Sequence, residues 1–175
     1  SSAANTLSLI GQDYADGGRY SQALIFFSKA LRAFQALGDK NQIARVNNLL
    51  SWVYTQQGNY AESVILNFAT LKVYEEQGDT DGIAIVSANI AEDYLNLGNY
   101  PEAIKYLKKS IKIMPENDKI NLAYTYCLLG KVYKTTSDYP AAINNYSTAL
   151  QMATTIQDNF SIALAYGGLG DVYQA

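Results

Sequence analysis

Apolar and small residues recur along the chain at steps of three and four positions, the period of a helix with one buried face. Ile43, Val46, Leu50 and Val53 form one such stripe. Short strings of Gly, Asn and Asp separate the stripes and are typical of turns. This pattern predicts an all-α chain with helices at 4–16, 20–37, 40–57, 60–77, 81–97, 100–114, 118–135, 139–156 and 159–174.

The turns recur at an almost constant spacing. Strings ending in Tyr20, Tyr60, Tyr100 and Tyr139 stand 40, 40 and 39 residues apart. Six residues before each of these tyrosines is another one, and a fifth copy follows, at Tyr14, Tyr54, Tyr94, Tyr133 and Tyr173. A fixed period of this length indicates a repeat protein. Two turns, Asn59 with Glu62 and Asn99 with Glu102, have the spacing of a capping box.

This repeat resembles the tetratricopeptide repeat, in a long form of about 40 residues found in bacterial signalling and regulatory proteins. The family's first-helix pattern is matched by Tyr126, Leu129, Gly130 and Tyr133, and its second-helix pattern by Ala142, Tyr146 and Ala149. The second unit departs from the pattern at Ser51, Ser63, Asn67 and Thr70. The resemblance implies a right-handed α–α superhelix of antiparallel hairpins, with small residues at close approaches between helices at Gly11, Ala91, Gly130 and Gly170.

The spacing divides the chain into about four and a half repeats. We expect one solenoid domain over residues 1–175, with repeats at 4–39, 40–79, 80–118 and 119–158 and a partial repeat at 159–175. Because the fifth repeat has only its first helix, we expect the sequence to be a segment of a longer protein.

Composition argues against catalysis. The chain has no histidine, which removes the commonest general base and metal ligand, so we expect no enzyme, no metal and no cofactor. A net charge of −3 argues against nucleic-acid binding by this segment. No apolar run is long enough to insert into a membrane. With one cysteine, Cys127, no intrachain disulfide forms. The sequence leaves the compartment unknown; a cytoplasmic location is favoured, and an extracytoplasmic sensor domain is the alternative.

In the tetratricopeptide family the first helices line a concave groove, and the resemblance implies a ligand groove here. Its expected residues are Ser8, Gln12, Arg45, Asn48, Trp52, Gln56, Asn89, Glu92, Asn96, Tyr124, Lys131 and Lys134, together with Leu164 and Asp171. Trp52, the only tryptophan, either faces this groove or packs in the seam between repeats. The lysines and asparagines with which some family members clamp a terminal carboxylate are absent.

These expectations predict a scaffold that binds a protein or peptide in its concave groove. Two alternatives stay open. In the first, the chain is a sensory or regulatory domain of a larger bacterial signalling protein, such as a histidine kinase or a transcription regulator. In the second, it is a structural module that self-associates through its open C-terminal end.

Overall fold

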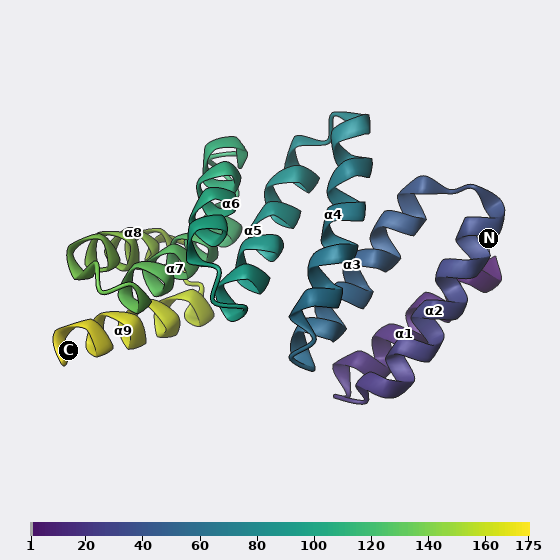
Figure 1. Ribbon diagram of the computed structural model, residues 1–175, viewed down its shortest axis with the longest axis horizontal. Coiled ribbons are helices and arrows are strands. Elements are labelled where there is room, and N and C mark those ends of the chain that lie inside the picture. Colours follow the sequence, from purple (N-terminus) through teal and green to yellow (C-terminus); the bar gives the residue numbers. More distant parts are fainter. Residues whose placement is uncertain (1) are drawn as a thin grey trace. The chain divides into compact units, whose positions relative to one another are not determined.

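The computed structural model describes residues 2–175, and these form nine α-helices with no strand among them (Figure 1). Residue 1 of the predicted domain lies outside the described residues. The helices are α1 (Ser2–Asp16), α2 (Tyr20–Leu37), α3 (Lys40–Gln56), α4 (Tyr60–Gln77), α5 (Thr80–Asn96), α6 (Tyr100–Ile113), α7 (Lys119–Thr135), α8 (Tyr139–Ile156) and α9 (Asn159–Tyr173). The all-α prediction is confirmed, and the predicted boundaries agree to within two residues.

A residue in the left-handed conformation lies in every turn between the described helices except that between α6 and α7, where Met114 is extended. Gly18, Gly38, Gly58, Gly78 and Gly98 all have φ between 66° and 77°. Glycine suits these sites because a Cβ is unfavourable at positive φ. The last two turns use other residues in this conformation, Ser137 at φ 62° and Gln157 at φ 57°.

Acidic or amide side chains cap many of the helix starts. Asp39, Asp118, Asp138 and Asp158 accept hydrogen bonds from backbone N–H groups two or three residues further on. Half of the capping box predicted at Asn99 is confirmed, because its side chain accepts a 3.5 Å bond from the Glu102 backbone N–H, whereas the Glu102 carboxylate accepts a bond from Lys105. The side chain of Asn59 makes no such bond, so the predicted capping box there is wrong.

The chain divides into two compact units. Unit 1 ends at Asp79 and contains the hairpins α1–α2 and α3–α4, whereas unit 2 (Thr80–Ala175) contains α5–α6, α7–α8 and α9. The core of unit 1 is built around buried Phe27, Phe34, Val46 and Val53. In unit 2 the core follows the same periodic positions, including Leu107 and Val132. That one continuous solenoid joins the units stays a prediction.

Two hairpins pair a large side chain with a glycine on the facing helix. A Cβ built on Gly11 would lie 2.6 Å from the Phe27 ring, and one on Gly130 would lie 2.9 Å from the Tyr146 ring. Both contacts are too short for any residue but glycine, so close approach at these positions is confirmed. The corresponding prediction for Gly170 is wrong. No atom lies within 4 Å of a Cβ built there.

The α3–α4 hairpin buries polar residues at four positions of the family pattern. Ser51, Ser63, Asn67 and Thr70 are all buried. The Ser63 hydroxyl lies 2.9 Å from the Thr55 hydroxyl and accepts a 3.3 Å bond from the Asn67 amide. These bonds satisfy the Ser63 hydroxyl and the Asn67 amide nitrogen, which the departure from the family pattern places in the core.

Candidate functional site

The structure places the predicted groove residues on the first helix of each repeat. In unit 1 they lie on α1 and α3, and in unit 2 on α5, α7 and α9. Their exposure varies along the helices. Arg45, Gln56, Asn96 and Lys131 are exposed, whereas Gln12 and Asn89 are half-buried and Gln12 donates a 3.0 Å bond to Asp16.

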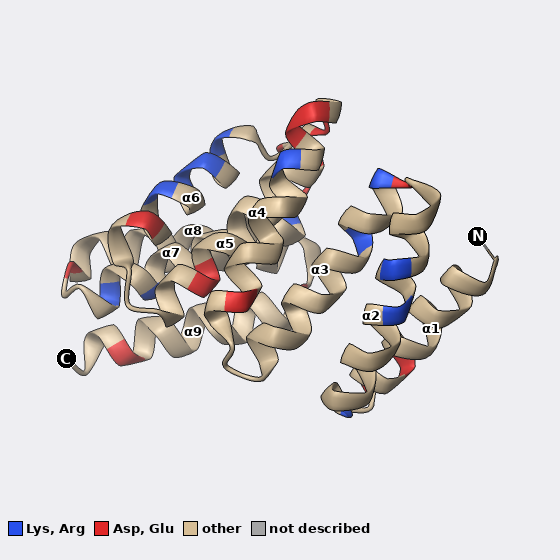
Figure 2. Cartoon of the chain, turned by 45° about the vertical axis from the view of Figure 1, so that its right-hand side comes forward, with Lys and Arg blue, Asp and Glu red and all other residues tan. Residues whose placement is uncertain are grey.

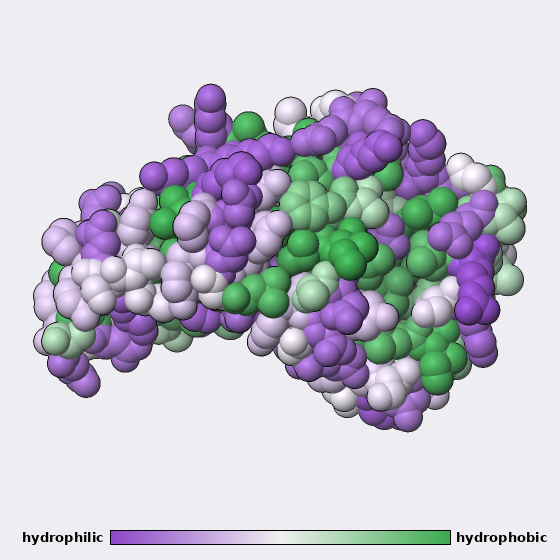
Figure 3. Space-filling view, viewed as in Figure 1, coloured by the Kyte–Doolittle hydropathy of each residue, from purple (hydrophilic) through white to green (hydrophobic). Residues whose placement is uncertain are grey.

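Trp52 in unit 1 combines exposure with a packing contact. Its side chain is 43% exposed, and its ring meets Tyr20 edge-on at a centroid distance of 6.0 Å. Tyr20 is the first residue of α2, so this contact links the two hairpins of unit 1. Trp52 therefore packs against the preceding repeat and still presents part of its ring to solvent. Hydrophobic side chains gather on one face of unit 1 between hydrophilic ones (Figure 3).

Ser8 and Asn48 occupy equivalent places on α1 and α3, 40 residues apart. The Ser8 Oγ and the Asn48 Oδ1 are shielded from solvent and make no hydrogen bond to other described residues. The side-chain oxygen of Asn48 is therefore unavailable to a ligand in this conformation.

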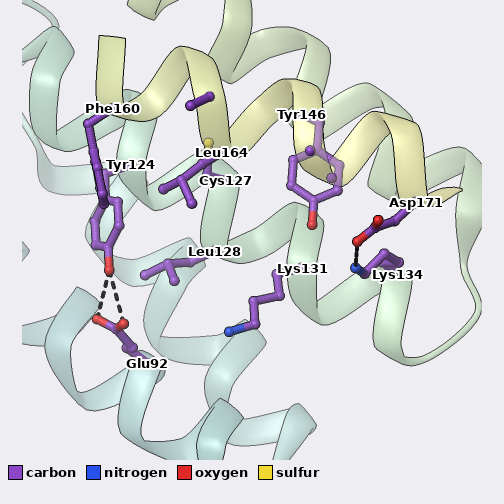
Figure 4. Close-up of a pocket in the computed structure, with 13 residues that line it drawn as sticks. Glu92, Tyr124, Cys127, Leu128, Lys131, Lys134, Tyr146, Phe160, Leu164 and Asp171 are labelled. Atoms are coloured by element: carbon purple, nitrogen blue, oxygen red, sulfur yellow. Dashed lines mark hydrogen bonds and ion pairs between the residues drawn. The ribbon is translucent and has the colours of Figure 1, made fainter. Parts of the chain in front are cut away.

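Unit 2 contains a hollow of about 470 Å³ between α5, α7 and α9 (Figure 4). Six predicted groove residues line it: Glu92, Tyr124, Lys131, Lys134, Leu164 and Asp171. The other lining residues are Cys127, Leu128, Tyr146, Phe160, Ala163, Gly167 and Gly168. A volume of this size is typical of a site for a small molecule or for a side chain of a partner.

Polar contacts fix the two ends of this hollow. At one end the Tyr124 hydroxyl donates to the Glu92 carboxylate, 3.0 Å from either oxygen. Burial and the negative charge of Glu92 raise the pKa of Tyr124 well above its usual range, so the phenol stays protonated and keeps this bond. At the other end Lys134 forms a 2.5 Å ion pair with Asp171.

Apolar groups line the space between those ends. The Tyr124 and Phe160 rings lie 6.0 Å apart and tilted, and Leu128 and Leu164 lie beyond them along the hollow (Figure 4). Phe160 is 64% exposed although it is aromatic. Exposed aromatic side chains beside a hollow are the usual anchors of protein interfaces.

Sequence reasoning missed Phe160, Leu128 and Tyr146 as lining residues. Phe160 sits near the start of the unpaired α9, and Leu128 reads as an ordinary core residue. Tyr146 belongs to a second helix, α8, which the resemblance assigns to the outer layer. The available signal was Gly168: an extra glycine in the helical pattern marks a place where another side chain passes close by. A Cβ on Gly168 would lie 2.2 Å from Tyr146 Cζ.

Cys127 lies at the floor of the hollow but is only 4% exposed. Its Sγ donates a weak 3.7 Å bond to the Ser161 carbonyl oxygen. Burial, followed by the negative charge of Asp158, raises the pKa of the thiol to about 12. The neutral thiol is a packing group here, because a nucleophilic cysteine must ionise near neutral pH.

The described residues show neither a metal site nor a membrane span. No cluster of three His, Cys, Asp or Glu side chains able to hold a metal occurs in residues 2–175. None of the helices described has the length and apolar character needed to cross a bilayer. Basic residues follow one another along α6, where they lie on the helix surface (Figure 2).

A family profile for the tetratricopeptide repeat matches residues 2–76 and 82–155. The chain belongs to the tetratricopeptide repeat family. Repeats of this family are helical hairpins of the kind seen in α1–α2, α3–α4, α5–α6 and α7–α8. No curated protein sequence matches the chain.

Solved structures share the tetratricopeptide fold at low sequence identity. BtubC (BKLC) from P. vanneervenii superposes with a TM-score of 0.79 at 20% identity, over 88% of this chain and 64% of that one. The apo form of RapI gives a TM-score of 0.80 at 17% identity, over 88% of this chain and 43% of RapI. The present chain thus spans less than two thirds of either protein, and the likeness concerns the fold alone.

Proposed function

We propose that this tetratricopeptide chain is a scaffold that binds a peptide segment of a partner protein, and that the hollow between α5, α7 and α9 is its recognition site. The observation that carries the proposal is the wall of Tyr124, Phe160 and Leu164, which leaves apolar surface open beside charged groups. Apolar pockets edged by a few fixed polar groups are the usual form of binding sites.

The helices make this site rigid before a ligand arrives. Its lining residues come from helix interiors of α7 and α9, and the Glu92–Tyr124 and Lys134–Asp171 contacts join neighbouring helices. A preformed site reduces the loss of conformational freedom on binding, so a short segment suffices for useful affinity. A regulatory domain of a larger signalling protein, the alternative from the sequence, would use the same hollow as its input site.

Selection from a random displayed peptide library tests this function. The immobilised chain is the bait, and enriched peptides are then measured against Leu164→Gln and Ile120→Gln. Leu164 on α9 and Ile120 on α7 are both exposed, but only Leu164 lines the hollow. Peptides that lose affinity for Leu164→Gln and keep it for Ile120→Gln support the proposal. A library that enriches no peptide, or only peptides indifferent to Leu164→Gln, contradicts it.

Self-association is a second candidate function, favoured by the outer face of α9. Tyr166 and Tyr173 are 62% and 73% exposed, and Gly170 faces no atom within 4 Å. The equivalent Gly130 packs against Tyr146 of the following helix, so a helix from a second copy of the chain fits this face. Sedimentation over a wide concentration range tests the idea. A mass of one chain at every concentration rules it out.

A further inference from the structure

Lys131 supplies the hollow with a cation that no described carboxylate neutralises. It is exposed, and no ion pair joins it to any residue in 2–175. The other charged groups of the lining are engaged. Glu92 accepts from the Tyr124 hydroxyl, and Asp171 pairs with Lys134. Figure 4 shows the Lys131 side chain extending into the space between these two contacts.

Tyr146 adds a hydroxyl donor to the same space. It reaches the hollow from α8 because Gly130 and Gly168, on the two helices in front of it, have no side chains to block its ring. The residue is only 3% exposed, yet its hydroxyl points into the hollow and makes no hydrogen bond to any described residue (Figure 4). Burial raises the pKa of this phenol to about 12, so it is protonated at neutral pH.

The equivalent positions in the other hairpins show that this hydroxyl is particular to unit 2. Phe27, Asn67 and Leu107 stand where Tyr146 stands in the α7–α8 hairpin. Only Tyr146 has both the length to pass between first helices and a polar group at its end. A purely structural filler does not require that group, and an unpaired hydroxyl contributes nothing to packing.

We propose that the hollow binds an apolar side chain together with an adjacent acidic side chain of the partner peptide. The apolar group contacts Phe160, Leu164 and Leu128, while the carboxylate accepts hydrogen bonds from Lys131 Nζ and Tyr146 Oη. This inference rests on the proposed function and specifies its ligand. The occupant is an internal segment of a partner protein that carries an apolar residue next to an acidic one.

Charge decides between an acidic and a basic ligand. A basic side chain would be repelled by Lys131, and the carboxylates of Glu92 and Asp171 already have partners. A carboxylate, in contrast, would neutralise the charge of Lys131. We assign the carboxylate to a side chain because Lys131 lies between the two bonded ends of the hollow (Figure 4). The peptide backbone then continues past Lys131 in both directions.

The test uses a peptide selected through the hollow as described above, synthesised with blocked ends. Its acidic residue is replaced by the matching amide, and both peptides are titrated against the wild-type chain, Lys131→Gln and Tyr146→Phe. We expect the amide peptide to bind the wild type about ten-fold or more weakly, as is typical of a lost charge-assisted hydrogen bond. Lys131→Gln should remove that difference, and Tyr146→Phe should reduce it.

Matched variants separate recognition from folding. Lys108→Gln, on the exposed surface of α6, and Tyr139→Phe, at the start of α8, remove the same groups outside the lining and should leave both affinities unchanged. Hollow-dependent peptides that bind equally well as acid and amide, or only with a free C-terminal carboxylate, overturn this inference and leave the proposed function standing. An acid preference that survives Lys131→Gln also overturns it. Failure to select any hollow-dependent peptide overturns both.

Discussion

The ring of Tyr146 lies so close to the backbone of Gly168 that a Cβ at residue 168 would be 2.2 Å from Tyr146 Cζ. The two residues belong to different repeats, since Tyr146 is on α8 and Gly168 is on α9. Gly130 on α7 meets the same ring. One tyrosine therefore joins three helices of unit 2 and also reaches the hollow that we propose as the binding site.

The first prediction concerns Gly168→Ala. The added methyl group overlaps the Tyr146 ring, which is buried and cannot move aside freely. We expect the free energy of unfolding to fall by about 1–3 kcal/mol relative to Gly167→Ala. Gly167 is the matched control, because it lies in the same helix and a Cβ there meets no atom within 4 Å. Urea denaturation followed by circular dichroism measures both variants.

A further pair of variants tests whether Tyr146 causes this fall in the free energy of unfolding. Leucine occupies the equivalent position in the α5–α6 hairpin, as Leu107, so Tyr146→Leu offers a shorter side chain that the fold accepts. In the Tyr146→Leu background, Gly168→Ala should cost clearly less than it does in the wild type. Equal costs in the two backgrounds would show that the methyl group clashes with something else.

The sequence predicted the fold almost completely because the repeat and its turns are local signals. Helix boundaries agreed to within two residues, since left-handed glycines and acidic caps mark them in the sequence. The cap expected at Asn59 was wrong although Asn99 has the same spacing. The backbone torsions of the two residues are similar, with φ −86° and ψ 60° at Asn59 and φ −89° and ψ 72° at Asn99, so the difference lies in the side chains, whose orientation the spacing does not report.

The site was less accessible to sequence reasoning. Six of the predicted groove residues do line one hollow, but the family pattern could not reveal that Tyr146 crosses from the second helix layer into it. That crossing depends on two glycines, 38 positions apart, acting on one ring. Gly170 was wrongly given the same role, because a glycine's purpose depends on what packs against it in three dimensions.

Gln157→Gly should stabilise the chain. Gln157 ends α8 at φ 57°, a conformation that costs a residue with a Cβ about 1–2 kcal/mol. Glycine avoids this cost but loses about 0.5–1 kcal/mol through its more flexible unfolded chain. We expect a net gain of about 0.5–1 kcal/mol, seen as a higher urea midpoint. Gly38→Ala, the reverse change at an equivalent turn, should lower the midpoint, and a rise there would contradict the argument.

Trp52→Ala should weaken unit 1 as well as any binding by its surface. The substitution removes the edge contact with Tyr20 and the buried part of the indole, so we expect the free energy of unfolding to fall by about 1–2 kcal/mol. Trp52→Phe keeps a ring at this position and should recover part of this free energy. Thermal unfolding by circular dichroism measures both. An unchanged stability for Trp52→Ala would mean that the Tyr20 contact contributes nothing, leaving the exposed ring as its only role.

Stability should fall with rising pH above about 9, and Cys127 should cause the first part of the fall. Burial raises its pKa from 9.0 to about 12, so the folded protein holds a proton that the unfolded chain releases. This contribution is therefore fully present below pH 9.0 and is lost between pH 9.0 and about 12. The limiting slope is about 1.4 kcal/mol per pH unit. The tyrosines, including Tyr146, have an ordinary pKa of 10.0 and act only from there upward.

Cys127→Ala isolates the thiol within this window. The variant is expected to lose some stability at all pH values, because the buried sulfur is replaced by a smaller group. Its unfolding free energy should nevertheless stay level between about pH 9 and pH 10, where that of the wild type declines. Urea titrations at several pH values in this range provide the comparison. Parallel curves for the two proteins would show that the Cys127 thiol titrates alike in the folded and unfolded chains.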